Sequence, residues 1–184
     1  MTNLLRNVAA LIIAITILQL AGGLLGVRLP LAFANHSRTE LGLVAASYSA
    51  GFMMGAVIAT TLLARVGHIR VYAACAAIFA VATLALHFTG DVWSWGVARM
   101  IAGLAVALLF AVIESWLAFS IHSRVRGEIM SVYMVCTKGA LALGPYFAFG
   151  YAPDAPEPWM IAAALAAISL VPICFTETAQ PDPP

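Results

Sequence analysis

Three ionisable side chains, Arg99, Glu114 and Lys138, lie inside long apolar stretches of this chain, whereas the other charged residues fall in short connectors between the stretches. A charged side chain near the middle of a bilayer costs about 3 kcal/mol or more, so such residues are rare and usually face a partner or a water-filled cavity. The three residues are therefore the first candidates for chemistry, as members of a path for a solute or a proton.

Glu114 and Lys138 are placed for an ion pair. Glu114 precedes the connector at 122–128 by about eight residues and Lys138 follows it by about ten, so both lie roughly 12–15 Å from that connector along their helices. We expect a carboxylate that lines the path, with a pKa tuned by Lys138 and with Arg99 as a further electrostatic partner. The alternatives are a static bridge that fixes helix register, and long side chains that extend to the interface.

Gln19 lies near the middle of the first apolar stretch, where a buried amide needs a partner. It either joins the same path or forms a hydrogen bond between helices. The histidines and cysteines show no spacing typical of a metal site, and no nucleophile and base occur at matching depth. We therefore expect no metal, no cofactor and no enzyme activity, and the net charge of +1 argues against a nucleic-acid partner.

The composition indicates a membrane protein. Apolar residues make up 63% of the 184 residues and charged residues 9%, whereas ordinary soluble domains carry about 25% charged residues. About 20 predominantly apolar residues are enough for a helix to cross a bilayer. The sequence predicts an all-α membrane domain over residues 1–175 with six transmembrane helices, at 8–27, 41–63, 71–88, 95–121, 129–149 and 159–175.

The basic connectors predict the orientation, because Lys and Arg collect on the cytoplasmic side of a membrane. The N-terminus and the connectors near 64–70 and 122–128 carry five arginines, against two in the connectors on the other side. Both termini are therefore expected in the cytoplasm, including a Pro-rich tail at 176–184. The two groups are Arg6, Arg65, Arg70, Arg124 and Arg126 against Arg28 and Arg38.

Small residues recur at four-residue steps in four of the six stretches. In lipid, where helices have no hydrophobic drive to associate, such faces let two backbones approach closely. We expect helix contacts along these faces, which also suit helices that slide in a moving bundle. The sets are Ser47, Gly51, Gly55 and Ala59; Gly22 and Gly26; Gly103, Ala107 and Ala111; and Ala140, Gly144 and Ala148.

The fourth stretch and the connector between the second and third carry a family resemblance. Arg99 is followed four residues on by Gly103 and further small residues, and Arg65, Gly67 and Arg70 form a basic, glycine-containing connector. Both are similar to motifs of the major facilitator superfamily of secondary transporters. Three positions depart from its pattern: Ala102 stands where a Gln is expected before the first glycine, Ala64 where an acid is expected before the first arginine of the connector, and Thr60 where the connector motif begins with glycine.

Gly144 and Pro145 in the fifth stretch resemble the antiporter motif of the same superfamily, without its trailing glycines. Glu114 with the following serine, and the basic run at 123–127, look like one bacterial subgroup of it. The resemblance covers nearly the whole chain but only half of the usual twelve-helix fold. It implies two inverted three-helix repeats, with helices one, two, four and five lining a central cavity.

The expected function is therefore a half-length secondary active transporter in the bacterial inner membrane, which moves a small solute by alternating access. Proton coupling is a further expectation, and the mostly apolar cavity suits an amphipathic solute. The connector at 63–70 would act in gating. A complete transporter would need a second copy or a separate C-terminal half. The alternative is a truncated product or a non-transporting membrane scaffold subunit.

Overall fold

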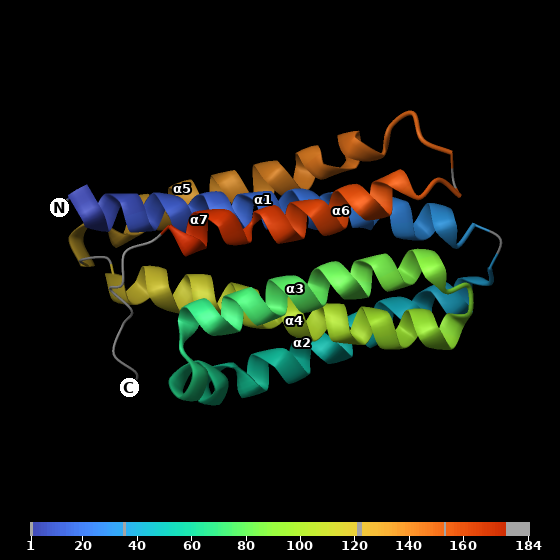
Figure 1. The fold of residues 1–184 in the computed structure, drawn as a ribbon, viewed down its shortest axis with the longest axis horizontal. Coiled ribbons are helices and arrows are strands. Elements are labelled where there is room, and N and C mark those ends of the chain that lie inside the picture. The colour runs from blue at the N-terminus through green and yellow to red at the C-terminus, as the bar shows by residue number, and fades with distance from the viewer. Residues whose placement is uncertain (1, 35, 121–122, 153, 176–184) are drawn as a thin grey trace.

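A computed structural model describes residues 2–34, 36–120, 123–152 and 154–175, and within these ranges every regular element is a helix. The helices lie side by side along one long axis and reverse direction at each connector (Figure 1). They are α1 (Thr2–Ala32), α2 (Arg38–Val66), α3 (His68–Phe88), α4 (Val92–Ser120), α5 (Ser123–Leu143), the 3-10 helix η1 (Gly144–Ala148), α6 (Glu157–Ile168) and α7 (Leu170–Cys174).

Five segments of the described chain are long and apolar enough to cross a membrane: α1 from Arg6, then α2, α3, α4 as far as Phe119, and α6 with α7. Helix α5 matches the predicted fifth span in position but not in composition, because it carries Arg126, Glu128 and Lys138. The prediction of six spans is thus met for five of them. The predicted tail at 176–184 and the end of the fourth span at 121 lie outside the described residues.

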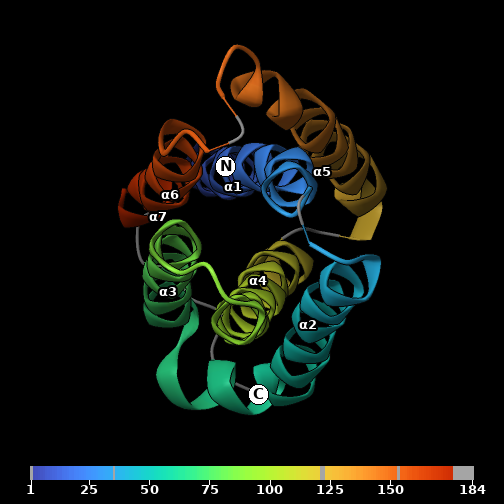
Figure 2. The same ribbon diagram turned by 90° about the vertical axis from the view of Figure 1, so that its right-hand side faces the viewer.

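The helices form two layers, which Figure 2 shows end-on. In one layer α1 lies between α5 and α6 with α7, and in the other α4 lies between α2 and α3. Contacts between α3 and α6, and between α1 and α4, join the layers. Consecutive helices are therefore often not packed together: α5 follows α4 in the chain but packs against α1 and η1.

Helices α2 and α4 cross at a backbone contact that only glycine permits. A Cβ atom at Gly51 would collide with the carbonyl oxygen of Met100, and one at Gly103 with that of Tyr48. A Cβ at Gly55 would lie 2.6 Å from the carbonyl oxygen of Leu104. The four-residue spacing therefore predicted this contact face correctly.

A second close crossing joins α1 to the end of α5. Gly23 and Gly144 face each other, and a Cβ at Gly144 would lie 2.7 Å from the Cα of Gly23. The glycines expected on α1 were different ones. Nothing lies within 4 Å of a Cβ built on Gly26, and Gly22 has only side-chain neighbours at 3.7 Å. Gly144 thus lies in a close helix contact as expected, whereas on α1 the backbone contact is made by Gly23 rather than by the expected Gly22 or Gly26.

Prolines interrupt two helices. Pro145 has no N–H for the carbonyl of Leu141, so α5 ends at Leu143 and continues as η1. Pro172 likewise cannot bond to the carbonyl of Ile168, and the sixth predicted span is broken into α6 and α7 there. The buried Ser169 at this break accepts a hydrogen bond from Tyr72 of α3, at 3.2 Å.

Side-chain caps precede the first turns of α2 and α4. Ser37 and Glu40 form a reciprocal capping box at the start of α2, in which each side chain accepts from the other residue's backbone N–H. Asp91 accepts from the backbone N–H of Ser94 at 2.9 Å before α4. Hydrogen bonds from Ser94 hold the pKa of the Asp91 carboxyl below its ordinary value, because they favour its charged form.

The glycine crossing of α2 and α4 can be tested with one matched pair of substitutions. Gly51→Ala is expected to destabilise the protein by about 1–3 kcal/mol, because the new methyl group forces the two backbones apart. Gly42→Ala in the same helix has open space around it, and should be neutral or stabilising by up to about 1 kcal/mol through helix propensity. Thermal unfolding in detergent measures both, and equal midpoints would contradict the close crossing.

Candidate functional site

A cavity of about 340 Å³ lies between the two layers and is lined by both of them. Four of the five helices around it are those expected to form the path, α1, α2, α4 and α5, and α3 contributes one phenylalanine. Three of the predicted path residues line the cavity and Glu114 does not. The lining residues are Leu18, Gln19, Gly22, Leu25, Gly26, Leu29, Tyr48, Phe79, Arg99, Val106, Phe110, Lys138 and Leu141.

Arg99 lies over the ring of Tyr48, with its guanidinium carbon 4.0 Å from the ring centroid. The position follows from the glycine crossing, since Gly103 is one helical turn after Arg99 and packs on the backbone of Tyr48. Arg99 makes no hydrogen bond or ion pair with any residue that the structure describes. A cation–π contact is worth about 0.5–2 kcal/mol, and it leaves the N–H donors of Arg99 unused.

Lys138 and Gln19 face the same cavity from α5 and α1. The side chain of Lys138 is exposed and that of Gln19 is nearly buried, at 8%. Neither forms a hydrogen bond or ion pair within the described ranges. The part of the lining that the structure describes contains no acidic residue. Two cations and an amide are thus gathered around one cavity without a counter-ion.

Glu114 accepts a hydrogen bond from the hydroxyl of Tyr133, at 3.1 Å. Tyr133 is buried on α5, while Glu114 itself is exposed on α4. No ion pair joins Glu114 to Lys138 among the residues described, so the predicted pair is wrong. Lys138 lies five residues beyond Tyr133, about 7.5 Å further along α5.

The mistake in pairing Glu114 with Lys138 has a physical reason. Equal counts from a connector give equal depth, but two side chains at equal depth meet only if their helices pack against each other. Helix α5 instead leaves α4 and packs against α1 in the other layer. Glu114 lies one turn beyond Phe110, which lines the cavity, and six residues before the end of α4.

The predicted gating connector is reduced to a single residue. Gly67 alone separates α2 from α3, with a φ of 89° that favours glycine. Arg65 and Arg70 are exposed on either side of it, on the last turn of α2 and the first turn of α3. All three residues therefore lie at one end of the bundle, away from the cavity.

His68, which directly follows Gly67, is buried. Its Nε2 atom lies 3.0 Å from the hydroxyl oxygen of Ser115 in α4. Ser115 donates its own proton to the carbonyl of Val112, which makes His68 the donor. The start of α3 is thus fixed to α4 one residue after Glu114.

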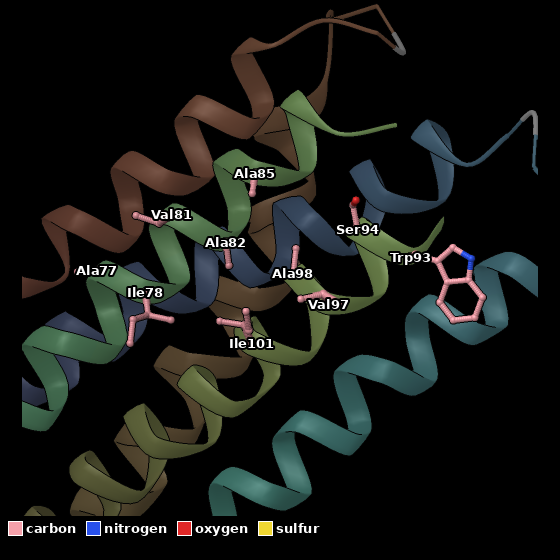
Figure 3. A pocket seen from close by; sticks show the side chains of 10 residues that line it. All are labelled: Ala77, Ile78, Val81, Ala82, Ala85, Trp93, Ser94, Val97, Ala98 and Ile101. Carbon is pink, nitrogen blue, oxygen red and sulfur yellow. The ribbon is translucent and has the colours of Figure 1, made fainter. Parts of the chain in front are cut away.

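A larger hollow, of about 680 Å³, lies between α3 and α4 at the opposite end of the bundle (Figure 3). Its lining is mostly aliphatic, and only Ser94 and Trp93 among the lining residues carry a polar side-chain group. Such a groove provides van der Waals contact but no means of selecting a polar solute. No cluster of three or more metal-ligating side chains occurs in the described chain.

Arg28 was counted as a charge in a connector, and the structure shows it buried at 2% exposure. Its guanidinium donates to the carbonyl oxygens of Ala152 and Ala155, at 2.8 and 2.5 Å, and lies 5.6 Å from the ring centroid of Trp159. It therefore ties the end of α1 to the connector before α6. Nothing in the neighbouring sequence distinguishes Arg28 from the exposed Arg38.

The Arg28 contact gives a prediction about stability. Arg28→Lys should lower the midpoint of thermal unfolding, because one ammonium group cannot reach both carbonyls, and each hydrogen bond from a charged donor is worth about 1.5–3 kcal/mol. Arg38→Lys changes an exposed side chain and serves as the matched control. Equal midpoints for the two variants, measured by tryptophan fluorescence in detergent, would contradict the assigned role.

Comparison with known proteins identifies the family. The family model of the Major Facilitator Superfamily matches residues 11–184. An uncharacterized MFS-type transporter of Enterobacter sp. (strain 638) is 32% identical over 180 residues, and the YcaD proteins of Escherichia fergusonii and Salmonella enteritidis PT4, which carry the same description, are 32% and 31% identical over 175 and 180 residues. These alignments cover 93–96% of this chain and 45–47% of each relative, so the chain spans about half their length. The chain is a multi-pass membrane protein that belongs to the Major Facilitator Superfamily.

Proposed function

We propose that this chain forms one six-helix half of a secondary active transporter, and that its cavity is part of the path of a small solute. The observation that carries the proposal is the cavity itself, which lies between two helix layers and gathers Arg99, Lys138 and Gln19, none of which forms a hydrogen bond or ion pair with a described residue. Polar side chains left unpaired at membrane depth mark substrate paths. The protein would act in the bacterial inner membrane by alternating access.

An inverted repeat is supported by the packing of the helices. If the labels of α1, α2 and α3 are exchanged with those of α4, α5 and α6, each main contact between helices becomes another contact that the structure contains. The α2–α4 contact becomes α5–α1, and the α3–α4 contact becomes α6–α1. The glycine crossings follow the same exchange, with Gly103 corresponding to Gly23. Such repeats are the usual basis of alternating access in transporters.

Completion by a second six-helix unit is supported by the exposed faces of α2 and α5. The most apolar stretch of α2 is only 17% buried, the lowest value of the five candidate spans. Exposed apolar residues continue on α5, among them Val132 and Val135. A second copy of the chain or a separate C-terminal half would cover these faces and close the cavity. The half-length match to the relatives fits either arrangement.

The orientation and the sixth crossing are part of the proposal. The junction of α2 with α3 and the start of α5 lie at the end of the bundle where α1 begins (Figure 1). These segments carry the exposed residues Arg65, Arg70 and Arg126, and basic ends favour the cytoplasm. Both termini would then be cytoplasmic. Helix α5 would cross the membrane despite its charges, since Lys138 faces the cavity and Arg126 and Glu128 lie in its first turns, near the water.

Alternating access is testable without a known substrate. Leu141 lines the cavity and is partly exposed, so Leu141→Cys, with Cys75, Cys136 and Cys174 replaced by alanine, should react with a membrane-impermeant maleimide from both sides. Labelling is measured in right-side-out and inside-out vesicles of the expressing bacterium, where any partner half is present. Ala105→Cys, at 0% exposure and outside the cavity, should remain unlabelled from both sides. Labelling of position 141 from one side only would contradict the transporter.

Glu114 is the proposed proton-binding group. Protonation would weaken its bond from Tyr133, because hydrogen bonds to charged groups are stronger than those to neutral ones. The α4–α5 contact at the proposed cytoplasmic end would then loosen. Acidification should increase cytoplasmic labelling of Leu141→Cys, and Glu114→Gln should keep that labelling high at every pH. Glu128→Gln, at the exposed start of α5, is the control. If the labelling of Leu141→Cys responded to pH as strongly with Glu114→Gln as with the native Glu114, Glu114 would not be the proton-binding group.

A further inference from the structure

Arg28 is buried and Arg99 is partly buried, and the two guanidinium groups have different partners. Arg28 donates to two carbonyl oxygens and lies near an indole ring. Arg99 has only the face of Tyr48. A guanidinium carries five N–H donors in a fixed fork that matches a carboxylate or phosphate. The donors of Arg99 are therefore open to whatever enters the cavity.

Lys138 adds a second positive charge to the same cavity, from the opposite helix layer. Arg99 is only partly exposed, and closing the cavity around both cations would take water from them, which costs several kcal/mol for each ion unless a counter-charge is present. The described residues offer none here: Glu114 lies outside the lining and is bonded to Tyr133. The cavity thus has an excess of two positive charges for an occupant to neutralise.

The remaining lining is apolar and aromatic. Phe79 and Phe110, with leucines of α1, surround the polar groups, and Gln19 adds an amide that can donate or accept. Ligand sites of about 300–1,000 Å³ hold small organic molecules with a few polar anchors, and this cavity of about 340 Å³ is at the small end of that range.

We propose that the cavity binds a small amphipathic organic anion, with its carboxylate on Arg99 and Lys138 and its apolar body against the phenylalanines. This inference rests on the proposed function and assigns the substrate class for the same site. Arg99 would receive the carboxylate through two parallel N–H donors while Tyr48 holds the guanidinium from behind. Lys138 would act as a point charge on the other side.

The test compares three ligands of one shape and different charge. The chain is reconstituted in nanodiscs of phosphatidylcholine, which has no net charge and does not compete for the cations. Binding of 2-naphthoate, 2-naphthamide and 2-naphthylmethylamine is measured by equilibrium dialysis. The carboxylate should bind at least about tenfold more tightly than the amide, the effect expected of one charge-assisted hydrogen bond. The amine should bind least.

Variants then locate the binding. Arg99→Gln and Lys138→Gln should each weaken naphthoate binding roughly 10- to 100-fold and abolish the preference for the carboxylate. Arg38→Gln removes an exposed cation that does not line the cavity, and should leave both unchanged. Because the ligand comparison uses the unaltered chain, it holds even if a variant fails to fold.

Equal binding of naphthoate and naphthamide, stronger binding of the amine, or no binding of any of the three would overturn the inference. These results would leave the proposed transporter standing, since the labelling of Leu141→Cys does not depend on the charge of the solute. Conversely, one-sided labelling together with selective naphthoate binding would retain the anion site and remove alternating access.

Discussion

Close backbone contact at glycine is the constraint on which the rest of this bundle depends. In lipid two helices gain little by burying apolar side chains, so their attraction comes from van der Waals contact and hydrogen bonds between them. The Gly51–Gly103 and Gly23–Gly144 crossings bring α2 to α4 and α5 to α1. They also set the lining of the cavity, because the backbone of Tyr48 rests on Gly103 and its ring thereby meets Arg99, one turn away.

The charged side chains within the bundle differ in how far partners in the protein stabilise their charge. Arg28 is bonded to carbonyls, Glu114 to a phenol, and Arg99 only to the face of a ring. Lys138 has no partner in the described chain. Partners fixed within the protein make a charge structural, whereas a charge that lacks them stays available to a ligand or to water. On this ground we assign the proposed solute site to Arg99 and Lys138 rather than to a Glu114–Lys138 pair, and Glu114 keeps only the proposed role in proton binding.

The sequence predicted well how far along its helix each residue lies, but it predicted only in part which neighbour each side of a helix faces. Hydropathy located the helices, and four-residue spacing located the contact face of α2, because both depend on neighbouring residues alone. The sequence did not predict that α4 and α5 lie in different layers, because a short connector does not determine whether the two helices that it joins pack together. The burial of Arg28 was missed for the same reason: its partners, Ala152 and Ala155, come from a connector more than 120 residues away. Gly23 differs from Gly22 only in direction, by about 100° around α1.

Some features of the site follow from membership of the superfamily, and others are particular to this chain. The superfamily accounts for the helix order and the layered bundle, but substrates within one fold differ widely. The pairing of Arg99 with Tyr48, the position of Lys138 on the cavity wall and the removal of Glu114 from it are particular to these residues. An acid directed into the cavity would neutralise one cation and favour a neutral solute. Tyr133 bonds to the nearby carboxylate, which lies outside the described lining, so the lining keeps its two positive charges. Under the proposed function, that charge rather than the fold would decide which solute can enter.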